Sequence, residues 1–296
     1  MRAANPPDNP TVMTKNLTCL VVVLGSFLMG ARVKAQDAHL RVVLDPATFA
    51  GPAYRALQGT ADQVAREVEQ LIPGASSDTE VFCFAPPARW GHAPITLAGE
   101  PQPGEPAASA SYAIRIALSR SVLPANRERF AFQLAHELAH VRMNPRVDND
   151  IIETFAVAVS FEVLDRMGYG RYLQVAMRSL IVPLPAEIRA AVGNGSWNEV
   201  KQYLKEQRQY HQQHPFDYSL AAAGAMLIRA TGTFPWNRLL GVGLKNQCPA
   251  RSEPPRFQFC PLNESALPEF LPVFRLLGRD TPPGELASRG INPGGN

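Results

Sequence analysis

Residues 130–159, which read FAFQLAHELAHVRMNPRVDNDIIETFAVAV, decide the fold of this chain. In their first half, apolar residues recur three and four positions apart, and this spacing predicts a helix over residues 124–143. The Asn144-Pro145 pair ends the pattern. From residue 151 to residue 159 the chain is apolar on nearly every side, which predicts a second helix that is buried. A short turn between the two makes them an antiparallel hairpin.

Three polar residues of the first helix, His136, Glu137 and His140, indicate a metal centre. Residues four apart on a helix lie on one face, about 5–6 Å from each other, so both histidines can turn a ring nitrogen toward one ion. Two neutral imidazoles suit zinc, and a catalytic zinc takes three protein ligands and leaves a fourth position to water. The alternative is a half-buried helix with two ordinary histidines and a solvated glutamate.

The HELAH pentapeptide and its helical context resemble the zincin metallopeptidases. The resemblance covers residues 110–168 and implies an enzyme that hydrolyses peptide bonds through a zinc-bound water, with Glu137 as the general base. Met143 and Arg146 stand where metzincins have a glycine and a third histidine, which excludes that subclass. The chain is more similar to compact gluzincins of the minigluzincin type. Thermolysin-like enzymes carry an aspartate four residues after the third ligand, where this chain has Val157.

Glu153 is the third ligand that this arrangement predicts. It is the only charge in the apolar run of the second helix, and a carboxylate buried there needs a cation or hydrogen-bond donors. In a hairpin, His140 and Glu153 lie at similar distances from the turn and face each other. Glu162 lies about 13.5 Å further along the helix axis and half a turn round, so it cannot replace Glu153. Two alternatives remain open: a capping box formed by Asp150 and Glu153, and Asp148 or Asp150 as the ligand.

A hydrogen-bond donor for the developing oxyanion is also expected. In gluzincins a tyrosine or histidine downstream of the third ligand supplies it. The candidates in this stretch are Tyr210, His211, His214 and Tyr218, of which we select His211 and Tyr218. Surface histidines and tyrosines at helix ends are common, so each candidate also has an ordinary structural interpretation.

The predicted fold class is α+β and zincin-like, with a small mixed sheet, the active-site helix hairpin and a mainly helical C-terminal lobe. Residues 40–44 and 81–85 are typical of strands, and residues 60–72 of a helix capped by its first residue. Residues 86–106 are rich in Pro and Gly, which predicts a loop. Residues 111–119 alternate strictly, and we expect an edge strand there that pairs with extended substrate. An internal strand is the alternative.

Three regions follow from these patterns. Residues 36–168 are the expected zincin-like core, and residues 169–280 are the helical lobe. In this lobe one helix begins at Ser196 and runs toward residue 213, and another spans residues 218–230. Residues 281–296 are rich in Pro and Gly, and we expect a disordered tail.

Residues 1–35 are expected to be a signal-peptide region. From Met13 onward they combine Lys15, an apolar run and Val33-Lys34-Ala35, the layout of a secretory signal. The apolar run is short for a membrane span. We therefore expect cleavage after Ala35, export to the periplasm or the medium, and no stable membrane span. The alternatives are a retained anchor and a true start at Met13.

The charge balance argues against nucleic acid as a partner. The chain has 29 Lys and Arg and 26 Asp and Glu, and loss of residues 1–35 removes four basic residues and one acidic residue, leaving 25 of each. Without a basic stripe, the expected partner is a peptide or protein substrate. The oligomeric state and the cleavage specificity stay open. Alternatives are a catalytically silent binding protein of the cell envelope and a zinc hydrolase of non-peptide amides.

The cysteines agree with export. Cys19 lies in the signal-peptide region, and Cys248 and Cys260 flank a short Pro-rich loop. We expect a disulfide between the latter two in an oxidising compartment. Cys83 is left in a predicted strand, where a free thiol behaves as a small hydrophobic group.

Overall fold

The structure is a computed structural model that describes residues 40–46, 49, 52–74, 79–84, 95–98, 112–115, 127–215, 217–248 and 258–279. The predicted signal-peptide region, the predicted tail and residues 124–126 of the predicted motif helix lie outside these ranges.

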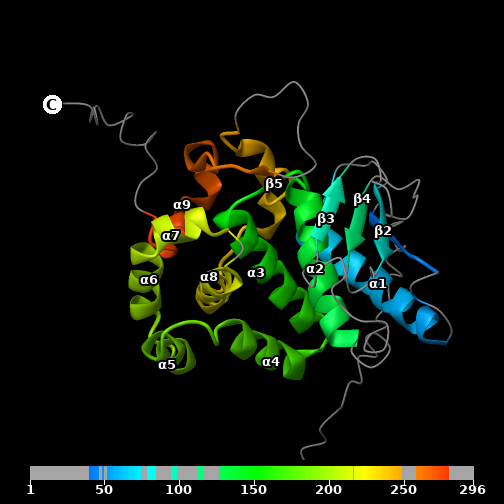
Figure 1. The fold of residues 1–296 in the computed structure, drawn as a ribbon, viewed down its shortest axis with the longest axis horizontal. Helices are drawn as coiled ribbons and strands as arrows, with labels where there is room; N and C mark the ends of the chain where they lie inside the picture. Colours follow the sequence, from blue (N-terminus) through cyan, green and yellow to red (C-terminus); the bar gives the residue numbers. More distant parts are fainter. Residues whose placement is uncertain are drawn as a thin grey trace, which may run out of the picture. The chain divides into compact units, whose positions relative to one another are not determined.

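Four short strands form a mixed sheet in the order β1-β2-β4-β3 (Figure 1). Their bounds are β1 Leu40–Leu44, β2 Thr79–Phe84, β3 Ile95–Ala98 and β4 Tyr112–Arg115. Strand β2 is parallel to both β1 and β4, whereas β3 is antiparallel to β4. Helix α1, Pro52–Leu71, connects β1 to β2 and packs against β1. A mixed sheet beside a mainly helical part is what the sequence predicts, and this is confirmed.

Two predictions about the sheet are wrong. The strand expected over residues 111–119 is not an edge strand, because β4 pairs with β2 on one side and with β3 on the other. The expected loop over residues 86–106 contains β3. Alternation along a strand reports which residues share a face, not how many neighbours the strand has. Strand β3 is therefore one of the two outer strands of the described sheet, β1 being the other, and β3 contacts helix α2.

Helix α1 starts eight residues before the predicted helix. Thr60 is not its cap, since its hydroxyl donates a hydrogen bond to the carbonyl of Ala56 at 3.0 Å within the helix. A Gly59-Thr60 pair is typical of a helix start, but one glycine inside a helix costs only about 1 kcal/mol. The buried apolar side of α1 continues across that glycine and offsets the cost.

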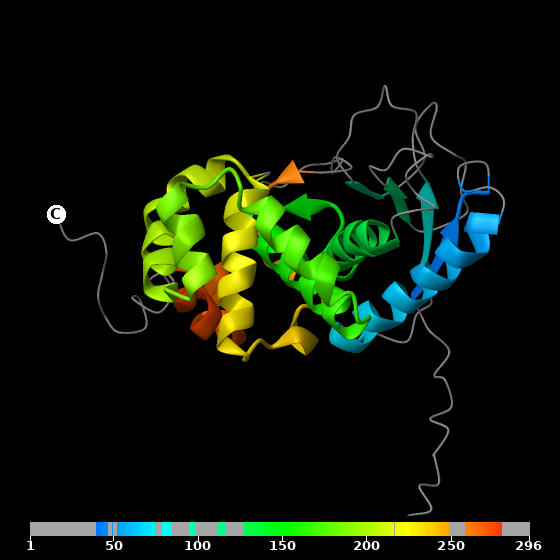
Figure 2. The same ribbon diagram turned by 90° about the horizontal axis from the view of Figure 1, so that it is seen from below.

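The hairpin that the sequence predicts is formed by α2, Arg127–Met143, and α3, Asp150–Arg166. In the turn between them, strand β5, Val147–Asp148, pairs in parallel with β6, Gln258–Phe259. Helix α3 lies at the centre of the molecule, between α2 and α8, Tyr218–Thr231 (Figures 1 and 2). Its side chains from residue 150 to residue 161 are all buried, which confirms the prediction of a buried second helix.

The rest of the chain is mostly helical, as expected. The helix predicted from Ser196 begins there but ends earlier, and a second helix follows after Gln207. The helix predicted over residues 218–230 is α8, one residue longer. The remaining elements are α4 Gly170–Leu180, α5 Ala186–Asn194, α6 Trp197–Glu206, α7 Arg208–Gln213, α9 Leu271–Leu276 and the 3-10 helices η3 Trp236–Arg238, η4 Val242–Lys245, η5 Glu264–Ala266 and η6 Pro268–Phe270.

The predicted cysteine chemistry is confirmed for the described residues. Cys248 and Cys260 form a disulfide, and Cys83 is a buried free thiol whose pKa is raised, chiefly by burial. A disulfide fits an oxidising compartment. Within the described part of the chain, no helix combines the length and apolar character needed to cross a membrane.

Helices α3 and α8 approach closely at Gly224. A Cβ atom built there would lie 2.9 Å from Cγ2 of Thr154, the residue after Glu153. Gly59 in α1 has nothing within 4 Å of the same position. The glycine of α8 is thus required by packing, whereas that of α1 is not.

Alanine at these two glycines should have opposite effects on stability. Gly59→Ala gains helix propensity and should raise the free energy of unfolding by about 1 kcal/mol. Gly224→Ala forces two helices apart and should lower it by about 1–3 kcal/mol. Thermal midpoints of both variants check this, and equal midpoints would show that α3 and α8 are not in close contact.

Candidate metal centre

The candidate metal centre lies between α2 and α3, close to the turn that joins them. His136 and His140 stand one turn apart on α2, and Glu153 lies in the first turn of α3. The Nε2 atoms of the histidines are 3.1 Å apart, and Glu153 carboxylate oxygens lie 3.3 Å from His136 Nε2 and 3.5 Å from His140 Nε2. All three side chains are buried, and together they could hold a metal ion.

The separations fit a single four-coordinate ion. Bonds of about 2.0–2.1 Å in a tetrahedron place neighbouring ligand atoms about 3.3 Å apart. The three observed separations of 3.1, 3.3 and 3.5 Å lie around that value. In addition, Oε2 of Glu153 is buried and accepts no hydrogen bond of good geometry from the described residues, which is expected of an oxygen that a cation satisfies.

The electrostatics of the centre also favour a cation. Burial by itself would raise the pKa of Glu153, but His136 and His140 hold it well below its ordinary value. Burial would lower the pKa of His136, and the charges of Glu153 and Glu137 raise it instead. A divalent ion bound by the same groups replaces protons on the ligands, so metal binding here should weaken as the pH falls.

The capping-box alternative for Glu153 is wrong. Asn149 caps α3, because its side-chain oxygen accepts two backbone N–H groups of the first turn at 2.9 and 3.1 Å. Asp150 is the first residue of the helix and forms an ion pair with Arg279, which is also buried. With Asp150 paired in this way, the Glu153 carboxylate is left to the histidines.

Asp148, the other alternative ligand, lies beside Glu153. Burial, followed by the negative charge of Glu153, raises the pKa of its carboxyl well above the ordinary value. One of its oxygens accepts the backbone N–H of Asn149 at 2.7 Å. Asp148 is not among the three described side chains whose ligand atoms converge, so we assign it to the support of the turn.

Glu137 is buried on α2 next to His136. Burial lowers the pKa of His136, whereas the charge of Glu153 and, to a smaller extent, that of Glu137 raise it. For Tyr218, burial and the charge of Glu153 raise the pKa most, and the charge of Glu137 raises it further. The four side chains therefore share one polar region. The catalytic role of Glu137 stays a prediction.

Tyr218 is the candidate donor that contacts a ligand directly. Its ring and that of His136 meet edge to face, with centroids 5.8 Å apart. Burial, and then the charges of Glu153 and Glu137, raise the pKa of Tyr218. The phenol consequently keeps its proton near neutral pH and can donate it in a hydrogen bond.

The other three candidates lie apart from the histidine ligands. His211 occupies a small cavity against Asp150 and Thr154, and burial lowers its pKa to about 4. Tyr210 and His214 are exposed and stack on each other with ring centroids 4.0 Å apart. Of the two residues selected from the sequence, Tyr218 contacts the ring of a ligand histidine, whereas His211 lines the small cavity with Asp150 and Thr154 and interacts with Glu153 through its charge.

An open pocket of about 780 Å³ adjoins Tyr218. Its lining includes the stacked rings of Tyr210 and His214 together with Phe259 and Leu180. Tyr218 therefore connects the candidate centre to a pocket with several aromatic and aliphatic walls.

Two residues near the centre were not found in the sequence. Asn149 precedes the second helix directly, where asparagine is a favoured cap, and this signal could have identified it. Arg279, the buried partner of Asp150, carries no local signal, because its role depends on a contact across 129 positions of the chain. Glu162 pairs with Arg229 and Arg166 outside the centre, as the helix geometry requires.

Comparison with known proteins gives no match: no protein-family model fits the chain, and no curated protein or solved structure is significantly similar to it. The geometry of the three ligands is therefore the observation on which a function rests.

Removal of the third ligand should abolish tight metal binding. Glu153→Ala takes away an anionic oxygen and should leave little metal bound after dialysis, whereas Glu162→Ala, on the same helix but paired with arginines, should bind one equivalent. Elemental analysis of both variants, purified in parallel, measures this. Full occupancy in the Glu153 variant would show that it is not a ligand.

Proposed function

We propose that this protein is an exported, zinc-dependent peptidase. The observation that carries the proposal is the arrangement of His136, His140 and Glu153 at tetrahedral separations, with Glu137 buried beside them. A donor set of two imidazoles and one carboxylate suits zinc. When bound, zinc polarises a carbonyl group and lowers the pKa of water.

Glu137 is the general base of the proposed reaction. Its carboxylate accepts a proton from the attacking water and then passes it to the leaving amine. The burial of Glu137 excludes bulk water from this exchange and strengthens its effect on neighbouring groups. The intact Glu137 favours catalysis over a silent binding role.

Tyr218 is the proposed donor to the oxyanion. Its phenol retains its proton because of burial and the nearby carboxylates, and its ring lies against His136. A neutral donor next to the ligands stabilises negative charge that develops on the carbonyl oxygen. His211, enclosed with Asp150 and Thr154, is not part of this proposal.

The substrate is proposed to be a peptide or protein segment. The pocket next to Tyr218 accommodates an apolar side chain near the scissile bond, since Phe259 and Leu180 are among its walls. Strand β3 is one of the two outer strands of the described sheet and contacts α2, so the pairing with extended substrate expected of residues 111–119 is proposed for β3 instead. The disulfide supports an exported location.

Glu137→Gln should separate metal binding from catalysis. The amide cannot accept a proton, so hydrolysis of a peptide library should fall by about 10²–10⁴-fold, while zinc stays near one equivalent because the three ligands are unchanged. Turnover and zinc content are measured on the same preparation. Undiminished, chelator-sensitive turnover would assign the base to another group.

Tyr218→Phe should lower kcat by about 10²–10³-fold with a small change in KM, because the hydroxyl acts on the transition state. Tyr172→Phe is the matched control, since that half-buried tyrosine of α4 packs against the core and is not among the residues that line the pocket beside Tyr218. Equal kcat values for the two variants would exclude Tyr218 as the donor.

A further inference from the structure

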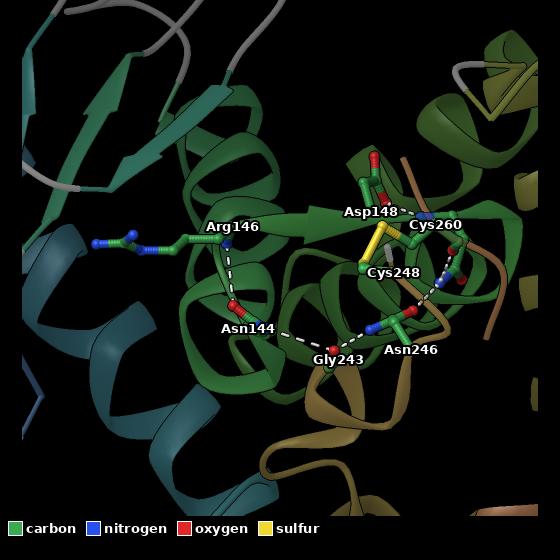
Figure 3. The surroundings of a disulfide bond; sticks show 8 residues. Asn144, Arg146, Asp148, Gly243, Asn246, Cys248 and Cys260 are labelled. Atoms are coloured by element: carbon green, nitrogen blue, oxygen red, sulfur yellow. Dashed lines mark hydrogen bonds between the residues drawn. A yellow bond between two sulfur atoms is a disulfide. The ribbon is translucent and has the colours of Figure 1, made fainter. Parts of the chain in front are cut away.

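The turn between the ligand-bearing helices, residues 144–149, is held by a distant part of the chain (Figure 3). The parallel β5–β6 pairing is made by backbone hydrogen bonds: the N–H of Gln258 donates to the carbonyl of Arg146 at 3.0 Å, and the N–H of Cys260 donates to that of Asp148 at 3.1 Å. Strands of two residues have little stability by themselves. The position of the turn therefore depends on the segment that contains Cys260.

That segment is half of a unit that we call the bracket, residues 241–248 and 258–263. Two backbone hydrogen bonds of 2.7 Å join its halves, and the Cys248–Cys260 disulfide links them covalently. The bracket also reaches the end of α2, because the N–H of Gly241 donates to the carbonyl of Arg142 at 3.1 Å. It thus holds both ends of the turn.

Asn149 connects the bracket to the third ligand. Its side-chain NH₂ donates to Asn246 Oδ1 at 2.6 Å and to the carbonyl of Cys260 at 3.2 Å, both in the bracket. Its side-chain oxygen caps α3 through two N–H groups, so the amide uses both donors and accepts two bonds. Its main-chain carbonyl accepts the N–H of Glu153 at 3.0 Å. A shift of Asn149 must therefore move the turn of helix that carries Glu153.

We propose that Asn149 is a positioning residue that transmits the geometry of the bracket to Glu153, so that metal affinity depends on the Cys248–Cys260 disulfide. The inference rests on the metal centre of the proposed function, not on hydrolysis. Reduction by a water-soluble trialkylphosphine, which unlike a dithiol does not compete for zinc as a thiolate ligand, delivers two electrons and breaks the S–S bond; the two thiols take their protons from water, whose oxygen leaves on the reductant as the phosphine oxide. Without the covalent cross-link, the two backbone hydrogen bonds hold the halves of the bracket side by side, so the position of Asn149, and with it that of Glu153, is less firmly fixed.

The test measures how fast zinc leaves the loaded protein in an excess of chelating indicator dye. Asn149→Ser keeps a hydroxyl that can cap α3 but loses the two donors to the bracket. Asn246→Ala removes one acceptor and leaves the cap intact. Both variants, the Cys248→Ser/Cys260→Ser double variant and the reduced wild type should release zinc about 10- to 100-fold faster than the oxidised wild type, the range typical of residues that orient metal ligands.

Val64→Ala is the matched control for a general loss of stability. Val64 is buried in α1 and belongs to no part of the bracket, so this variant should lower Tm while zinc release stays at the wild-type rate. Should the double variant fail to fold, the two asparagine variants and reduced wild type still decide.

Three outcomes separate this inference from the peptidase proposal. Unchanged zinc release in the reduced protein and in both asparagine variants overturns the role of the bracket and leaves the peptidase proposal intact. Faster release from a protein that hydrolyses no peptide supports the bracket and overturns the peptidase. A wild type that binds no zinc overturns both.

Discussion

The carboxylate of Glu153 is 2% exposed and lies within 3.5 Å of two imidazole nitrogens. Withdrawing a carboxylate from water costs several kcal/mol, whereas a helix cap or a surface ion pair returns about 1 kcal/mol or less. A positive charge at the same place offsets such a cost. The interface between α2 and α3 is therefore stable around a metal cation or around protonated histidines, and the two compete for the same ligand atoms.

The packing around α3 explains why Glu153 faces the histidines of α2 and not an arginine. Helices α1, α2 and α8 pack against it, and its small residues, together with Gly224 on α8, let the helices approach closely. Two acidic residues of its first turn nevertheless have different partners. Asp150 pairs with Arg279, and Glu153 faces the histidines. Because Arg279 pairs with Asp150, the carboxylate oxygens of Glu153 remain available to the candidate metal centre.

The parts of the molecule that the sequence predicts are those set by local periodicity. The α2–α3 hairpin follows from apolar spacing, and the convergence of His136, His140 and Glu153 follows from helix geometry on either side of a turn. Neighbour relations in the sheet do not follow, because alternation in residues 111–119 is equally compatible with an edge and an internal strand. The pairing of Asp150 with Arg279 is also invisible to local patterns, since it depends on the packing of the helical lobe.

At position 157 of α3, where thermolysin-like enzymes carry an aspartate, this chain has a valine. That position is 1% exposed among apolar side chains, so α3 offers no carboxylate there to orient a histidine. Support reaches the ligands from the turn instead, where Asp148 lies beside Glu153 and Asn149 fixes the start of α3. A ligand set encoded within 18 consecutive residues thus relies on hydrogen bonds to residues about a hundred positions later. The local motif determines which atoms can bind an ion, and the C-terminal part of the chain determines how firmly those atoms are held.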